Sequence, residues 1–196
     1  MKTYISILNV VKNYINGILG SATVKIGSYA NSSAPMDDKT IAIGYEAMRY
    51  GRGLNNIAIG ETSLRRVQGS HNIAMGYGSG KNVYSGANNV LLGTKAGNNI
   101  VSGNNNVAVG FESLRHNNDS WGNVAIGMCA SSHTYGENNV SVGTEALRFG
   151  QYSEWNVAIG NRAGFNLRGG NNNIFIGRIA QPSSAYVSNE ITIGNW

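Results

Sequence analysis

The sequence of 196 residues contains one cysteine, two prolines and 13% charged residues, and each scarcity excludes a class of protein. The single Cys129 cannot form an internal disulfide framework, and we expect a small buried side chain there. No apolar run approaches the roughly 18 residues of a membrane span. Asn9, Lys12 and Asn13 interrupt the early apolar stretch, so we expect neither membrane insertion nor a signal peptide.

One short phrase recurs along nearly the whole chain. Asn106-Val-Ala-Val-Gly110 returns as Asn123-Val-Ala-Ile-Gly127, and units of this type occur eleven times. Their closing glycines are 16 or 17 residues apart, and they are Gly27, Gly44, Gly60, Gly76, Gly93, Gly110, Gly127, Gly143, Gly160, Gly177 and Gly194. Internal repeats of this length decide the architecture of a chain.

Alignment on the glycines gives columns with distinct chemistry. The two residues that flank the middle of each phrase are aliphatic or Met, as in Ile57 and Ile59, and this period of two predicts a strand whose aliphatic face forms the core. The third residue after each of the first ten glycines is Ala or Ser. Such small residues indicate that backbones, or neighbouring chains, approach closely at this position. The Asn before most strands predicts a stacked amide ladder, and the glycine an unusual corner.

A unit of 16 or 17 residues with one strand is too short for a propeller blade or a helical hairpin. It suits one coil of a parallel β-solenoid. The sequence therefore predicts an all-β protein, a parallel β-solenoid or β-roll of about ten coils over residues 21–196. At the usual strand spacing, such a rod is roughly 50 Å long.

The first 20 residues have a different period. Their apolar residues are spaced alternately by four and three, which predicts a short N-terminal helix over residues 1–20. They are Tyr4, Leu8, Val11, Ile15 and Ile18. This segment is either a heptad that helps trimerisation or a lone amphipathic helix that caps the first coil.

The phrase N-[IV]-A-[IV]-G, followed by stretches such as "GYEAM", "GETSL", "GFESL" and "GTEAL", resembles the repeat of YadA-like heads in trimeric autotransporter adhesins. It resembles more closely the longer-period version in phage tail fibres and tailspikes. The closing "SNEITIGNW" is similar to sequences that lead into a self-cleaving C-terminal chaperone in some of those proteins. The resemblance covers residues 24–194.

The resemblance implies a homotrimer that attaches a phage to polysaccharide or lipopolysaccharide on the host cell. It also implies other virion tail proteins as partners, and a location in the virion after synthesis in the host cytoplasm. Alternatives are a purely structural fibre shaft, a bacterial adhesin head, or a depolymerase with paired carboxylates. An ice-binding solenoid is disfavoured because the sequence has no regular Thr array.

No residue pattern predicts an enzyme, a catalytic residue, a metal site or a cofactor. We place His71, His116 and His133 in different repeat columns, without metal-ligand spacing. The neighbouring Asp37 and Asp38 fall in a loop, and no phosphate-binding glycine motif is present.

Basic residues recur five positions after the glycines, at Arg49, Arg65, Lys81, Arg115 and Arg148. With a net charge of +5, this basic stripe could meet acidic or phosphorylated surface sugars. The alternative is that each base pairs with a Glu of its own coil, an adjacent coil or a neighbouring chain. Nucleic acid is not expected as a partner, because the bases are spread singly over the coils.

Residues that break the repeat are the better candidates for recognition. The loops "HNNDSWG", "SHTYGE" and "FGQYSEW" hold a concentration of aromatic residues beside polar ones. These predicted carbohydrate-binding residues are Trp121, Tyr135, Phe149, Tyr152 and Trp155. Aromatic faces stack on sugar rings, and loops on a rigid scaffold commonly carry binding sites. Alternatively, these rings pack in the trimer interface or cover the edge of the core.

Overall fold

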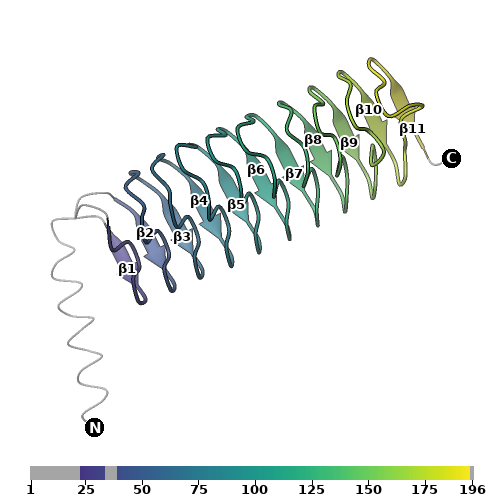
Figure 1. Ribbon diagram of the computed structural model, residues 1–196. Coiled ribbons are helices and arrows are strands. Elements are labelled where there is room, and N and C mark those ends of the chain that lie inside the picture. The colour runs from purple at the N-terminus through teal and green to yellow at the C-terminus, as the bar shows by residue number, and fades with distance from the viewer. Residues whose placement is uncertain (1–22, 34–38, 195–196) are drawn as a thin grey trace, which may run out of the picture.

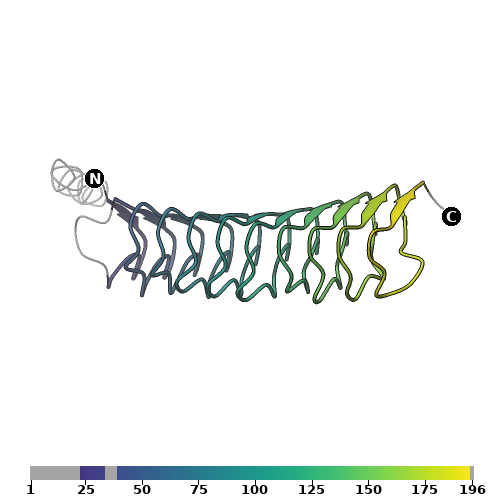
Figure 2. The ribbon, with the colours of Figure 1, turned by 90° about the horizontal axis from the view of Figure 1, so that it is seen from above.

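The computed structural model describes residues 23–33 and 39–194, which form a parallel β-solenoid of about ten turns (Figure 1). The strands follow one side of the rod and the loops the other (Figure 2). The predicted all-β class and the coil period are thus confirmed. The helix predicted at residues 1–20 lies outside the described residues. In those that are described, no helix has the length and apolar character needed to cross a membrane.

The described residues contain eleven three-residue strands in one parallel sheet, ordered as in the sequence. Each strand pairs with the next in register, as Ile57 of β3 pairs with Ile73 of β4. Equivalent residues of successive coils therefore stack along the rod. The strands are β1 (Val24–Ile26), β2 (Ile41–Ile43), β3 (Ile57–Ile59), β4 (Ile73–Met75), β5 (Val90–Leu92), β6 (Val107–Val109), β7 (Val124–Ile126), β8 (Val140–Val142), β9 (Val157–Ile159), β10 (Ile174–Ile176) and β11 (Ile191–Ile193).

The prediction of which strand face forms the core was wrong. The middle residue of each strand points inward, and Ala58, Leu91 and Phe175 are fully buried. The flanking aliphatic residues point outward, and Ile126 and Ile159 remain about 40% exposed. The coil interior is narrow, so the small middle residue suits it, whereas the bulkier β-branched residues fit on the outer face.

Packing inside the coils shows how narrow the interior is. Where the middle residue is large, glycine stands opposite it: a Cβ on Gly97 would lie 2.5 Å from the Leu91 side chain. Likewise, a Cβ on Gly164 would lie 2.8 Å from the Phe175 ring. Elsewhere this position holds a buried residue such as Leu114. Volume is thus conserved along the core, as close packing requires.

The column of Ala and Ser after each glycine also lies inside the coil. Ala47 and Ala163 are fully buried, and Ser79 Oγ donates a hydrogen bond to the Leu91 carbonyl at 2.8 Å. The small residues are therefore explained by close approach of backbones within one chain, the first of the two predicted explanations. Within one chain these small residues are already covered, so they offer no surface to a neighbouring chain.

The predicted asparagine ladder is confirmed. Each ladder asparagine is fully buried and stacks on the one before it, as Asn89 Nδ2 donates to Asn72 Oδ1 at 3.0 Å. The same Nδ2 donates to the Gly103 carbonyl at 2.9 Å, and Asn89 Oδ1 accepts the Asn106 backbone N–H at 3.0 Å. One side chain thus joins three coils. Its buried polar groups are satisfied without water, as buried amides require.

The repeated glycine forms the predicted corner. Gly110 has a φ of 129°, a conformation that side-chain-bearing residues rarely adopt. A Cβ there would also lie 2.6 Å from the carbonyl oxygen of Gly127 in the next coil. Both the backbone angle and the stacking distance therefore require glycine.

We expect Asn89→Ala to lower the free energy of unfolding by roughly 3 kcal/mol, because the Asn106 N–H and the Gly103 carbonyl lose their partners while buried. Chemical denaturation followed by circular dichroism measures this loss. Asn88→Gly is the matched control, since the exposed Asn88 has a φ of 58° that glycine adopts freely. Equal losses in the two variants would contradict a structural role for the ladder.

Candidate functional site

Aromatic and acidic side chains gather on three consecutive coils, those closed by Gly127, Gly143 and Gly160. We call this surface the aromatic–acidic patch. It comprises Asp119, Trp121, Tyr135, Glu137, Tyr152, Glu154 and Trp155. Its four rings are all exposed, from 40% at Tyr135 to 78% at Tyr152. The structure thus brings together four of the five predicted carbohydrate-binding residues.

The repeat places six of these seven residues in two columns, and Trp155 stands in the next column, five residues before Gly160. Asp119, Tyr135 and Tyr152 each stand eight residues before the closing glycine, and the two tyrosine rings lie 6.1 Å apart. Trp121, Glu137 and Glu154 each stand six residues before it. The residue between the two columns is Ser120, Gly136 or Ser153, and it is buried in each coil. The side chains of the two columns therefore lie on the outer surface, one on each side of it.

The two coils that flank the patch have no aromatic residue at these positions, although Tyr186 occupies the tyrosine column one coil further on. The coil before the patch has Ser102 and Asn104 at the two positions, and the coil after it has Gly169 and Asn171. The scaffold therefore tolerates small or polar residues there. Stability of the fold does not require aromatic rings at these positions.

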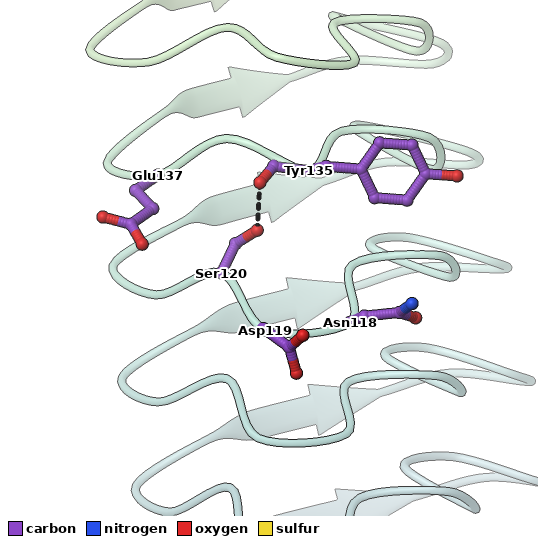
Figure 3. A pocket seen from close by; sticks show the side chains of 5 residues that line it. All are labelled: Asn118, Asp119, Ser120, Tyr135 and Glu137. Carbon is purple, nitrogen blue, oxygen red and sulfur yellow. Dashed lines mark hydrogen bonds between the residues drawn. The ribbon is translucent and has the colours of Figure 1, made fainter.

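A pocket of about 260 Å³ opens within the patch (Figure 3). It is lined by Asn118, Asp119, Ser120, Tyr135 and Glu137, which come from two adjacent coils. The Ser120 hydroxyl donates to the Tyr135 carbonyl at 2.5 Å and joins those coils at the pocket floor. Carboxylates, an amide and a phenol thus face a small polar hollow.

The interior beneath the patch is polar, unlike the apolar interior on either side of it. Asn117 Nδ2 donates to the Thr134 carbonyl at 2.8 Å, and Thr134 Oγ1 donates to the Leu147 carbonyl at 3.0 Å. Ser153 Oγ donates to the Gly150 carbonyl at 2.9 Å. The first two hydrogen bonds link neighbouring coils and the third closes a single loop, so together they hold the patch in one arrangement.

Trp155 is the one tryptophan of the described residues with a positive φ, a conformation that bulky residues such as Leu114 and Ile179 also adopt in this solenoid. Its φ is 58°, in the left-handed region, where the equivalent residues of neighbouring coils are Asn138 and Asn172. A bulky residue there costs about 1–3 kcal/mol relative to an unstrained conformation. The ring is 58% exposed and stacks on no other ring of the described residues. Neither packing nor backbone preference explains a tryptophan at this position.

The fifth predicted residue, Phe149, lies apart from the patch. Its ring packs between His133 and Phe165, at centroid distances of 5.7 and 5.0 Å. Two guanidinium groups, those of Arg148 and Arg168, lie over it at 5.2 and 4.5 Å. Phe149 therefore covers the coil surface in a stack with its neighbours, as the alternative interpretation of these aromatics proposes.

The assignment of the histidines to different columns was wrong for two of them. His116 and His133 both stand six residues after a glycine, and their rings stack at 4.9 Å. Burial lowers the pKa of both imidazoles, so both are neutral at pH 7. Among the described residues, no group of three or more His, Cys, Asp or Glu side chains could hold a metal ion. Cys129 is buried as expected, and burial raises the pKa of its thiol.

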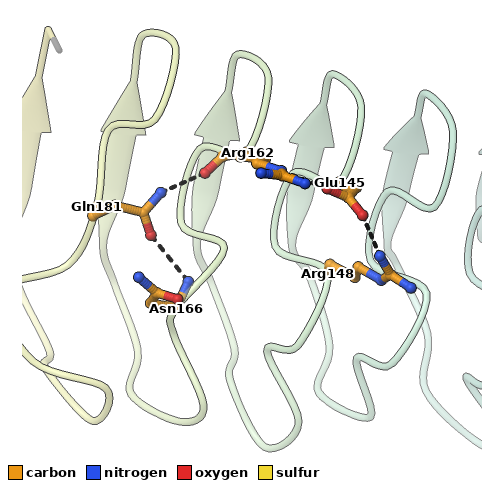
Figure 4. A network of polar contacts seen from close by, with 5 residues as sticks. All are labelled: Glu145, Arg148, Arg162, Asn166 and Gln181. Atoms are coloured by element: carbon orange, nitrogen blue, oxygen red, sulfur yellow. Dashed lines mark hydrogen bonds and ion pairs between the residues drawn. The ribbon is translucent and has the colours of Figure 1, made fainter.

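Most of the basic stripe is paired. Each of three glutamates holds two bases, one from its own coil and one from an adjacent coil. Glu46 pairs with Arg49 and Arg65, Glu112 with Arg115 and Lys95, and Glu145 with Arg148 and Arg162 (Figure 4). Among the described residues, Lys81 alone of the predicted stripe has no ion pair. Ion pairing thus accounts for four of the five bases.

Asp119, Glu137 and Glu154 were not among the predicted site residues. The available signal was their position in the repeat, because counting back from each glycine places them in the columns of the aromatics. Asp119 and Glu137 line one pocket, but neither is enclosed by apolar residues as a general acid is. The arrangement favours acceptance of hydrogen bonds over proton donation.

The chain matches no protein-family model, and no curated protein and no solved structure resembles it significantly. What is shown is therefore the architecture, a parallel β-solenoid of about ten turns with a regular spacing of about 17 residues. A solenoid fold is compatible with many functions, so the function depends on the residues of the site.

The Glu145 cluster predicts a pH-dependent stability. Hydrogen bonds from Arg162 and Arg148 lower the pKa of Glu145 below its usual range. The stabilisation is therefore complete above the unfolded-state pKa of about 4.3 and is lost as the pH falls through the lower folded-state value. We expect Glu145→Gln to be less stable than the wild-type protein at pH 7, by about 1 kcal/mol, and the difference to be smaller at pH 2.

Denaturant titrations at both pH values measure this difference. Glu61→Gln is the control, because the exposed Glu61 has no ion pair among the described residues. A Glu145→Gln deficit that is the same at both pH values would contradict the electrostatic explanation.

Proposed function

We propose that this chain is a receptor-binding segment of a phage tail fibre, a homotrimeric rod that attaches the virion to polysaccharide or lipopolysaccharide on the host cell. The observation that carries the proposal is the aromatic–acidic patch, with four exposed rings and three carboxylates on consecutive coils. Exposed rings stack on the apolar faces of sugars, and carboxylates accept hydrogen bonds from hydroxyl groups. A rigid scaffold that presents variable loops is a common design for binding.

The exposed Trp155 ring supports a binding role over a purely structural one. The neighbouring coils place asparagine at this position, so tryptophan is retained at a cost to backbone conformation. A plain shaft would keep the repeat residue.

In this proposal two further copies of the chain pack against the rod and form the homotrimer. The outward sheet face carries aliphatic residues from every coil, and Met75, Ile126 and Ile159 are each at least 40% exposed. An apolar face that runs the length of a rod is typical of an interaction surface. Contact through this face leaves the loop side free, so three patches could act together and convert weak sites into firm attachment.

The repeat phrase supports the assignment to a virion, since it resembles that of phage tail fibres. In this proposal other tail proteins join the rod, which is made in the host cytoplasm and acts outside the cell. The rod binds without catalysing a reaction and without a cofactor.

We expect the wild-type protein to have three times the chain mass of 20.8 kDa in solution. The double variant Ile126→Glu, Ile159→Glu should run as a monomer, because it places charges in an apolar contact. Light scattering after size-exclusion chromatography measures the mass, and circular dichroism checks the fold. The control is Tyr84→Glu, Val101→Glu, which alters exposed residues outside the sheet. A monomeric wild-type protein would overturn the trimer.

We expect a fluorescent fusion of the protein to label some Gram-negative strains and to lose that labelling on their O-antigen-deficient mutants. Trp121→Asn and Trp155→Asn should each weaken labelling about tenfold, because an aromatic contact worth about 1.4 kcal/mol is removed. Both changes introduce the residue found at the same position in a neighbouring coil, Asn104 or Asn138. The fold is therefore preserved.

Tyr77→Asn serves as the control for these variants. Tyr77 is 50% exposed but lies outside the patch, and Asn161 occupies its position in another coil. Flow cytometry compares the proteins on the same cells. If no strain is labelled, or if the tryptophan variants label as well as the wild-type protein, the rod is a structural shaft at this surface.

A further inference from the structure

The three carboxylates of the aromatic–acidic patch differ from the glutamates that hold the basic stripe, Glu46, Glu112 and Glu145. Among the described residues, Asp119, Glu137 and Glu154 form no ion pair, whereas Glu46 and Glu145 each hold two arginines. Asp119 accepts a hydrogen bond from the Ser102 hydroxyl, which leaves its charge in place. The patch therefore presents three uncompensated negative charges.

This segregation of charge is not a consequence of composition. The chain has 15 basic and 10 acidic residues, yet the three loop segments of the patch, residues 118–122, 135–138 and 151–155, contain no Lys or Arg. Two arginines near these segments, Arg148 and Arg168, lie over the Phe149 ring. A positively charged protein has thus a negatively charged aromatic surface on these three coils.

We infer that the patch binds a glycan stretch without acidic groups, and that this stretch runs along the rod axis from Trp121 to Trp155. The inference rests on the proposed function and names its ligand class. A uronate, sialate, phosphate or sulfate group would lie beside three like charges, each of which opposes binding. Neutral hydroxyl groups instead donate to the carboxylates, and such charge-assisted hydrogen bonds are stronger than neutral ones.

The orientation follows from the stacking of the coils. The Trp155 N–H donates to the Glu137 carbonyl at 3.1 Å, and the Asn138 N–H donates to the Trp121 carbonyl at 3.1 Å, so the three coils are directly adjacent. Two coil steps separate the tryptophans, about 10 Å at the usual strand spacing. This distance is comparable with the length of a disaccharide. Glu137 lies on the middle coil, where it can accept hydrogen bonds from hydroxyls between two stacked rings.

A glycan array with neutral and acidic oligosaccharides of graded length tests the inference on the 196-residue chain. We expect binding to neutral oligosaccharides longer than a disaccharide, and binding at least about tenfold weaker to analogues with a carboxylate, phosphate or sulfate. Both Trp121→Asn and Trp155→Asn should weaken binding to the same neutral glycans. The double variant Glu137→Gln, Glu154→Gln should bind acidic analogues several-fold better relative to neutral ones, while Glu61→Gln should leave that ratio unchanged.

The outcomes separate the inference from the proposed function. Preference for acidic glycans, or an unchanged ratio in the double glutamine variant, overturns the inference and leaves glycan binding in place. Loss of binding in only one tryptophan variant overturns the orientation along the rod. Failure to bind any glycan, with a folded protein by circular dichroism, overturns the proposed function and the inference with it.

Discussion

A single buried asparagine in most coils holds that coil to the one before it and the one after it. Asn89 illustrates the arrangement, because its amide bonds to Asn72 below and to both Gly103 and Asn106 above. A strand of three residues makes few ladder hydrogen bonds, so the register of the coils depends strongly on this side chain. Once the register is fixed, every other residue falls into a column, and the loops can vary without disturbing the stack.

The narrow interior imposes the second constraint. Most middle residues inside the coils are small. Where the middle residue is Leu91 or Phe175, a glycine faces it and leaves room for the larger side chain. The larger aliphatic residues are therefore placed outside, along the whole sheet face. The rod thus has an apolar side made by the strands and a polar, aromatic side made by the loops. Self-association and ligand binding would use different sides of the same coil.

Stacking also explains the two kinds of charge on the surface. Successive coils bring a glutamate within reach of bases from two coils, and this neutralises much of the predicted basic stripe. Among the described residues, no base pairs with Asp119, Glu137 or Glu154, because the neighbouring positions on adjacent coils hold aromatic or small polar residues. Charges that look alike in the sequence therefore have opposite surroundings in the rod.

The sequence by itself determined the repeat, the parallel solenoid, the asparagine ladder and the glycine corner, because each depends on local chemistry repeated at a fixed interval. It also located Trp121, Tyr135, Tyr152 and Trp155 by their departure from the repeat. Only the tertiary structure decided which strand face is buried. In a three-residue strand the alternation is the same whether the middle residue or its two neighbours point inward, and the narrow interior selects the middle residue. It likewise decided that the Phe149 ring packs between His133 and Phe165, because the repeat places residues in columns but does not fix the direction of their side chains.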